Sequence, residues 1–148
     1  MHRELLSVRT GGEEFAIDIM SVREIRGWSA STPLPHAPSY IKGMINLRGV
    51  VLAIVDLADR LGLAPTEPVA SSVVVVVQLG DRTVGLLVDA VSDIINVTDE
   101  MIQAAPDMGH KAIHDIVQGV LTIEDRIVSI LSLPALVPTE ALEAELAA

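Results

Sequence analysis

The sequence predicts a mainly β protein built from two tandem five-stranded barrels that share an apolar core. Three observations support this fold class: β-branched aliphatic side chains dominate, the apolar stretches are short and separated by turn signals, and the second half of the chain repeats the pattern of the first. Valine and isoleucine favour the pleated surface of strands. A five-stranded sheet of this size buries its apolar face best by curling into a small barrel, which also removes exposed edges.

The repeat is visible when the sequence is shifted against itself. A shift of 69 positions aligns the early strands of the two copies and places Phe15 on Val84. A shift of 76 positions aligns the later strands and places Ile54 on Ile130. We therefore expect each of these two pairs to occupy equivalent interior positions.

The domain organisation follows from the repeat. The 148 residues suit one compact domain, in which residues 1–63 form the first barrel and residues 72–137 the second, with exchange of strands between the barrels left open. The segment 64–72, "APTEPVASS", joins the copies. Residues 138–148 are expected to form a C-terminal helix.

Each copy contains five expected strands bounded by turn residues. In the first copy they are 4–10, 13–20, 22–27, 42–48 and 50–55. In the second copy they are 72–79, 82–89, 92–97, 116–122 and 126–131. The stretches "TGGEE" and "LGDRT" predict hairpins, and "RG" at Arg48-Gly49 with its repeat counterpart "EDR" predicts a further pair.

Two short helices complete the predicted elements. Asp56 is a typical N-cap for a helix over 57–61 that ends at Gly62. Thr139 is a typical N-cap for the amphipathic C-terminal helix, which carries Leu142 and Leu146 on one face.

Composition excludes several classes of function. The net charge is −10, and the acidic excess lies after residue 62, so nucleic acid is not expected as a partner because phosphate binding needs clustered Lys and Arg. There is no cysteine, and no apolar stretch approaches the ~20 residues of a membrane span. The N-terminus lacks an apolar signal core, so we expect a cytoplasmic protein without direct membrane insertion.

The sequence offers no catalytic motif, and we expect neither an enzyme nor a cofactor. Phosphate loops, nucleophile elbows and zinc-protease motifs are absent. His110 and His114, with Asp107 and Asp115 nearby, are spaced as metal ligands on a helical turn. A metal-binding or small-molecule-binding regulator therefore remains an alternative.

Arg48 is the one charge within the apolar stretch "GMINLRGVVLAIVDL". Its repeat counterpart is Glu124, so the turn itself does not require arginine. Glu24 and its counterpart Asp93 are acidic in both copies. We predict that Glu24 pairs with Arg48 across adjacent strands, either as a surface salt bridge or as an oriented charge for a partner.

Three stretches carry a resemblance to a known family. "IDIMSVREIRG", "YIKGMINLRGVVLAIVDLADRLGL" and "VGLLVDAVSDIINVTDEMI", in this order and spacing, resemble the CheW family of bacterial chemotaxis coupling proteins. The resemblance extends from Glu4 to about Leu136. One departure is Ala53, where the family commonly has proline; it leaves the strand after the hairpin with less reason to kink.

The resemblance implies two SH3-like barrels and a non-catalytic adaptor. Such adaptors couple the cytoplasmic hairpin tip of chemoreceptors to the regulatory domain of the histidine kinase CheA in a signalling array, and further copies of the adaptor can join in rings. An alternative within the family is the scaffold of a non-flagellar chemosensory pathway. The implied receptor-binding groove between the barrels is lined by Val22, Glu24, Arg48, Val73, Val91 and Ile94. The implied kinase-binding residues are Phe15, Ile17, Ile19, Pro106, Asp107 and Met108.

Overall fold

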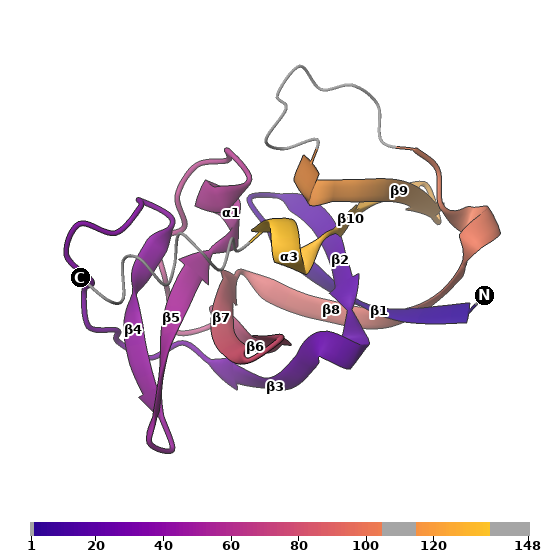
Figure 1. Ribbon diagram of the computed structural model, residues 1–148. Helices are drawn as coiled ribbons and strands as arrows, with labels where there is room; N and C mark the ends of the chain where they lie inside the picture. The colour runs from indigo at the N-terminus through magenta and orange to yellow at the C-terminus, as the bar shows by residue number, and fades with distance from the viewer. Residues whose placement is uncertain (1, 105–114, 137–148) are drawn as a thin grey trace.

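The computed structural model describes residues 2–104 and 115–136, and the strands within them form two five-stranded sheets (Figure 1). The strands are β1 (His2–Thr10), β2 (Glu13–Asp18), β3 (Val22–Gly27), β4 (Ile41–Leu47), β5 (Val50–Asp56), β6 (Val73–Leu79), β7 (Arg82–Val88), β8 (Ala90–Thr98), β9 (Val117–Ile123) and β10 (Arg126–Leu131). Each agrees with an expected strand to within two residues at either end. The short helical turns are η1 (Ile19–Ser21), α1 (Leu57–Arg60), η2 (Asp99–Met101) and α3 (Leu133–Leu136).

The two sheets each combine strands from both repeats. The first sheet has the order β3-β6-β7-β5-β4 and the second sheet the order β8-β1-β2-β10-β9; they lie side by side, on the left and right of Figure 1. Residues 1–63 and 72–137 therefore do not coincide with one barrel each, and the strand exchange left open above is present. The connections explain it: η1 carries β3 across to the other sheet, and the single residue Asp89 makes the equivalent crossing from β7 to β8.

The repeat extends to the irregularities of the strand pairing. Arg23 is skipped in the pairing of β3 with β6, and its counterpart Ser92 is skipped in the pairing of β8 with β1. Lys42 is skipped between β4 and β5, and its counterpart Gln118 between β9 and β10. A β-bulge bends its strand and increases the local twist, so both sheets curl at equivalent places.

Two equivalent glycines allow each sheet to close into a barrel. A Cβ on Gly43 would lie 2.5 Å from the carbonyl oxygen of Thr32, and a Cβ on Gly119 would lie 2.9 Å from that of Gln103. These close approaches accompany isolated bridges from Thr32 to Met44 and from Gln103 to Val120. In each sheet the chain leaving one edge strand thereby pairs with the opposite edge strand, which confirms the predicted pair of small barrels.

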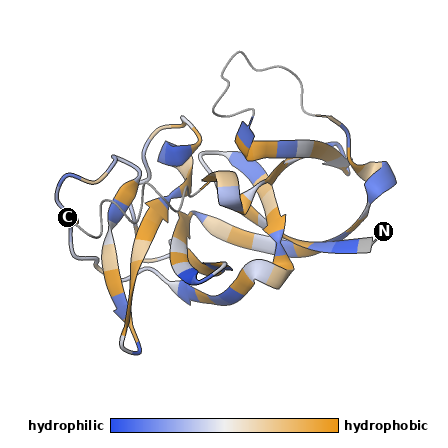
Figure 2. Ribbon diagram, viewed as in Figure 1, coloured by the Kyte–Doolittle hydropathy of each residue, from blue (hydrophilic) through white to orange (hydrophobic). Residues whose placement is uncertain are grey.

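Among the described residues the core falls into three clusters, which follow the alternation of side chains along the strands. Phe15 and Val84 both belong to a shared cluster between the sheets. Ile54 lies in a cluster inside the first barrel, and Ile130 lies in one inside the second barrel. All four side chains are buried, so the predicted equivalent interior sites are confirmed. Figure 2 shows β5 hydrophobic along nearly its whole length, because it faces two of these clusters.

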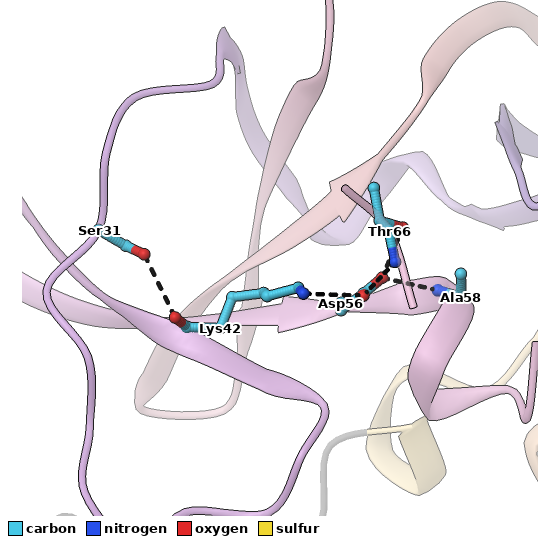
Figure 3. Close-up of polar contacts among 5 residues, drawn as sticks. All are labelled: Ser31, Lys42, Asp56, Ala58 and Thr66. Atoms are coloured by element: carbon cyan, nitrogen blue, oxygen red, sulfur yellow. Dashed lines mark hydrogen bonds and ion pairs between the residues drawn. The ribbon is translucent and has the colours of Figure 1, made fainter. Parts of the chain in front are cut away.

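Asp56 is a buried carboxylate that anchors the segment between the repeats (Figure 3). Its Oδ1 accepts the Ala58 N–H at 3.2 Å, which confirms the predicted N-cap of α1, and the Thr66 hydroxyl at 2.8 Å. Its Oδ2 accepts the Thr66 N–H at 2.7 Å and lies 3.7 Å from Lys42 Nζ. The carboxylate thus ties the end of β5, the start of α1 and the linker to one another.

The change Asp56→Ala is expected to lower the free energy of unfolding by about 3–5 kcal/mol, the range for removing one partner of a buried charge pair. It leaves the Lys42 ammonium without its carboxylate and the buried Thr66 groups without an acceptor. Urea denaturation followed by circular dichroism measures the change. Asp59→Ala, three residues away in α1 and with a partly buried side chain, is the matched control and should cost less than about 1 kcal/mol. Equal midpoints for the parent and Asp56→Ala would contradict this role.

None of the helices in residues 2–104 and 115–136 is long and apolar enough to cross a membrane. The predicted helix over 57–61 is present as α1, one residue shorter. The predicted helix over 138–148 and its cap Thr139 lie outside the described residues. Ala53 is buried and pairs regularly with Met44, so β5 continues through this position without interruption.

Candidate functional site

The turn between β4 and β5 holds Arg48 in a left-handed backbone conformation. Arg48 has φ 51° and Gly49 has φ 87°, as in a type I′ hairpin turn. The side-chain oxygen of Asn46 accepts the Gly49 N–H at 2.9 Å. A left-handed conformation costs a residue other than glycine about 1–2 kcal/mol, and such turns prefer Asn, Asp or Gly. Turn geometry therefore does not explain the arginine.

The equivalent turn between β9 and β10 has the same geometry with the opposite charge. Glu124 has φ 48° and Asp125 has φ 67°. Both predicted hairpins are thus confirmed. Because the same backbone position accepts a cation in one repeat and an anion in the other, the charge at Arg48 is independent of the fold of the hairpin.

Arg48 and Glu24 form the predicted pair, with Nη2 of the guanidinium donating to Oε1 of the carboxylate. The prediction that they do so across adjacent strands is wrong. Glu24 lies on β3, at one edge of the first sheet, whereas Arg48 lies in the hairpin of β4, at the other edge. The curl of the sheet brings these edges together, so the pair spans the end of the first barrel.

The pair contributes little to stability. The Arg48 side chain is 72% exposed and that of Glu24 is 29% exposed. Ion pairs of this kind contribute about 0–1 kcal/mol, which at best offsets the cost of the left-handed arginine. Neither the turn nor the closure of the barrel therefore explains an arginine at this position.

A cleft of about 340 Å³ opens beside the pair at this end of the first barrel. We call it the first mouth. It is lined by Arg23, Glu24, Leu47, Arg48, Val50, Leu52, Val76 and Thr83. Leu47, Leu52 and Val76 are buried members of the cluster inside the first barrel and form an apolar floor. Arg23, Glu24 and Arg48 place charges around it.

The sequence matches a known family: the family model for the CheW-like domain covers residues 4–141. The chain belongs to the CheW-like domain family. The chemotaxis protein CheW of Rhizobium meliloti is 50% identical over 96% of this chain and 92% of its own length. That of Klebsiella aerogenes is 34% identical over 93% and 83%. This CheW-like domain is therefore assigned to the chemotaxis scaffolds. The family is non-catalytic.

The fold is also that of a solved CheW structure. The crystal structure of the scaffolding protein TtCheW from Thermoanaerobacter tengcongensis superposes with a TM-score of 0.81 at 27% identity, covering 90% of each chain. This similarity supports the mainly β fold with two five-stranded sheets.

The residues expected to line a groove between the barrels of this CheW-like domain fall into three groups. Val22, Val73 and Val91 are partly buried and pack against the shared cluster. Glu24 and Arg48 are brought together at the first mouth. Ile94, on the edge strand β8, is 49% exposed, so its side chain is free to meet a partner.

Two of the expected kinase-binding residues are not on the surface. Phe15 is 7% exposed and Ile17 is 0% exposed, because β2 is covered by the shared cluster on one face and by the interior of the second barrel on the other. Their assignment to a binding face was therefore wrong. Ile19, in η1, is partly buried against the shared cluster. Pro106, Asp107 and Met108 lie outside the described residues.

Of the residues that line the first mouth, sequence reasoning named only Glu24 and Arg48; it missed Arg23, Val50 and Thr83 and the apolar floor of Leu47, Leu52 and Val76. The signal was in the repeat, since Val50 and Thr83 align with the charged residues Arg126 and Glu14. A neutral residue in one repeat that aligns with a charged residue in the other marks a position where the two barrels differ in chemistry.

The histidines of the metal hypothesis, His110 and His114, lie outside the described residues, as does Asp107. Asp115 is described and is exposed. Among residues 2–104 and 115–136, no three His, Asp or Glu side chains are grouped closely enough to hold a metal ion.

Proposed function

We propose that this CheW-like domain is a cytoplasmic adaptor that couples chemoreceptors, the methyl-accepting chemotaxis proteins, to a CheA-like histidine kinase in a signalling array. Membership of the family supports this role, and Arg48 is the residue of this chain that supports it most directly. The arginine is held in an unfavourable turn conformation, is 72% exposed and contributes little to stability, which is typical of a residue retained for a partner.

The proposed receptor surface combines Ile94 with the Glu24–Arg48 pair and the three valines at the junction of the barrels. A receptor tip is a helical hairpin, and a helix binds a groove through apolar residues spaced at i, i+3, i+4 and i+7. The kinase surface is proposed to include Ile19 and the segment 106–108. Separate surfaces would let one adaptor hold both partners at once.

Isothermal titration calorimetry with two partners tests the function directly. The parent protein is titrated with a fragment containing the receptor tip and, separately, with the regulatory domain of a CheA-like kinase from the same organism. Binding to both is the expected result. A parent protein that binds neither fragment would contradict the proposed function.

The change Ile94→Asp is expected to weaken binding of the receptor fragment by ~30-fold or more, the effect of losing an apolar hot spot of about 2 kcal/mol. Kinase binding should remain within ~threefold of the parent. Ile94 is half exposed, so the change should not unfold the protein.

Val69→Asp is the control for Ile94→Asp. Val69 is 58% exposed and lies in the linker, outside both proposed surfaces, so this variant should bind both fragments like the parent. Equal loss of receptor and kinase binding in Ile94→Asp, with unchanged circular dichroism, would show that the two surfaces are not separate.

A further inference from the structure

The two barrels have structurally equivalent mouths. The parallel pairing of Ile54 with Gly85 in the first barrel recurs as the pairing of Ile130 with Ala16 in the second. Every residue that lines the first mouth therefore has a counterpart in what we call the second mouth. The counterparts that change the chemistry are Ser92 for Arg23, Glu124 for Arg48, Arg126 for Val50, Ser7 for Val76 and Glu14 for Thr83, whereas Asp93 keeps the negative charge of Glu24.

The second mouth is filled by a hydrogen-bonded ionic network. Glu14 is buried, with a side chain 5% exposed, although it is ionisable. Its Oε2 accepts the hydroxyl of the buried Ser7 at 2.6 Å, and its Oε1 accepts Nη1 of Arg126 at 3.0 Å. Nη1 of Arg9 lies 3.8 Å from the same oxygen. At the equivalent place the first mouth has Thr83, Val50 and an open cleft.

The rims of the two mouths also differ in charge. The first rim has Arg23, Glu24 and Arg48, and the carboxylate of Glu24 is paired with Arg48. Nε of Arg23 donates to the neutral amide oxygen of Gln78 at 2.8 Å, so the charge of Arg23 is not matched by that bond. The equivalent second rim carries Asp93 and Glu124.

We propose that Glu14 and Arg126 form a plug that makes the two mouths non-equivalent, and that only the first mouth receives a partner. The occupant is an aliphatic side chain of the receptor segment, with a carboxylate of that segment beside it. This inference rests on the proposed adaptor function. It adds the kind of partner side chain that binds at the Arg48 end of the molecule.

The chemistry of the first mouth selects this occupant. Its floor of Leu47, Leu52 and Val76 is apolar and gains from burying an aliphatic group. The partner's carboxylate meets the guanidinium of Arg23, with which it can form charge-assisted hydrogen bonds. At the second mouth the same segment meets a filled interior and two like charges, which oppose it.

Placing the plug in the first mouth tests the proposal. The variant Thr83→Glu with Val50→Arg introduces the two plug residues at their equivalent positions. Val50 is 54% exposed and Thr83 is partly buried at the cleft, so both new side chains can be accommodated. Calorimetry is done with the receptor fragment and the kinase regulatory domain separately. We expect affinity for the receptor fragment, whose proposed surface includes Glu24 and Arg48, to fall at least ~tenfold, and affinity for the kinase domain to stay within ~threefold of the parent.

Two single changes keep the test decisive if the double variant does not fold. Thr83→Leu fills the cleft without adding charge and should weaken the same partner at least ~tenfold. Thr83→Val adds no length and should bind as the parent does. If the folded double variant and Thr83→Leu both bind both partners within ~twofold of the parent, the first mouth is not occupied and the inference is wrong.

The change Arg23→Gln tests whether the partner presents a carboxylate to the first mouth. The variant should bind the same partner more weakly, and the dependence of its affinity on salt between 50 and 300 mM NaCl should be shallower than that of the parent. An unchanged salt dependence would contradict an acidic occupant. A parent protein that binds neither fragment would instead disprove the adaptor function itself, so the two failures are distinguishable.

Discussion

A chain that ends after Leu63 is expected not to fold. Residues 1–63 contain β1 and β2 of the second sheet together with β3, β4 and β5 of the first. Without β6 and β7, the strand β3 is no longer joined to β5; without β8 and β10, the β1–β2 hairpin loses both neighbours. The apolar side chains of the shared cluster would be left facing water. Circular dichroism should show no cooperative thermal transition.

Two complementary fragments provide the control for this truncation. The linker residues Val69 and Ala70 are exposed, so a break after residue 70 falls in an exposed part of the linker. Fragments 1–70 and 71–148 should each be unfolded alone and should form a folded one-to-one complex when co-expressed, because each sheet needs strands from both. Cooperative unfolding of residues 1–63 by themselves would show that the first repeat is an independent unit.

Exchanging the charges at the first mouth, Glu24→Arg with Arg48→Glu, is expected to leave stability unchanged and to abolish coupling. Glutamate is accepted at this turn position, since Glu124 has φ 48° in the equivalent hairpin. The exchanged side chains can still pair, so the free energy of unfolding should stay within about 1 kcal/mol of the parent. A partner, however, meets the opposite arrangement of charge, and losing a directed arginine contact of about 2 kcal/mol weakens binding ~30-fold.

The matched control for the exchange is Glu124→Arg, which makes the second hairpin resemble the first. It alters the same turn position at the plugged end of the other barrel and should leave receptor and kinase binding within ~threefold of the parent. Calorimetry measures both affinities, and urea denaturation measures stability. Normal binding by the exchanged protein would show that the Glu24–Arg48 pair is only structural.

The local elements of this protein were predictable from short stretches of sequence. These elements depend on residues within a few positions of one another. They include the hairpins at Arg48-Gly49 and Glu124-Asp125, the helix cap at Asp56 and the alternation of side chains along each strand. The repeat added the equivalence of Phe15 with Val84, because identical elements in identical order bury equivalent side chains. Comparing the charges at equivalent positions of the two repeats predicted that Glu24 pairs with Arg48. It did not predict that the pair spans the two edges of the first sheet.

The tertiary structure alone decided which strands share a sheet and what each side chain faces. Pairing of β3 with β6 and of β8 with β1 depends on which sheet edges meet after the chain crosses between barrels, and no local pattern contains that information. The burial of Phe15 and Ile17 has the same cause, since β2 is covered on both faces only once the two barrels pack together. Glu14 likewise reads as an exposed strand charge in the sequence. Its role at the second mouth exists only because the strand order β1-β2-β10 places Ser7, Glu14 and Arg126 on three neighbouring strands.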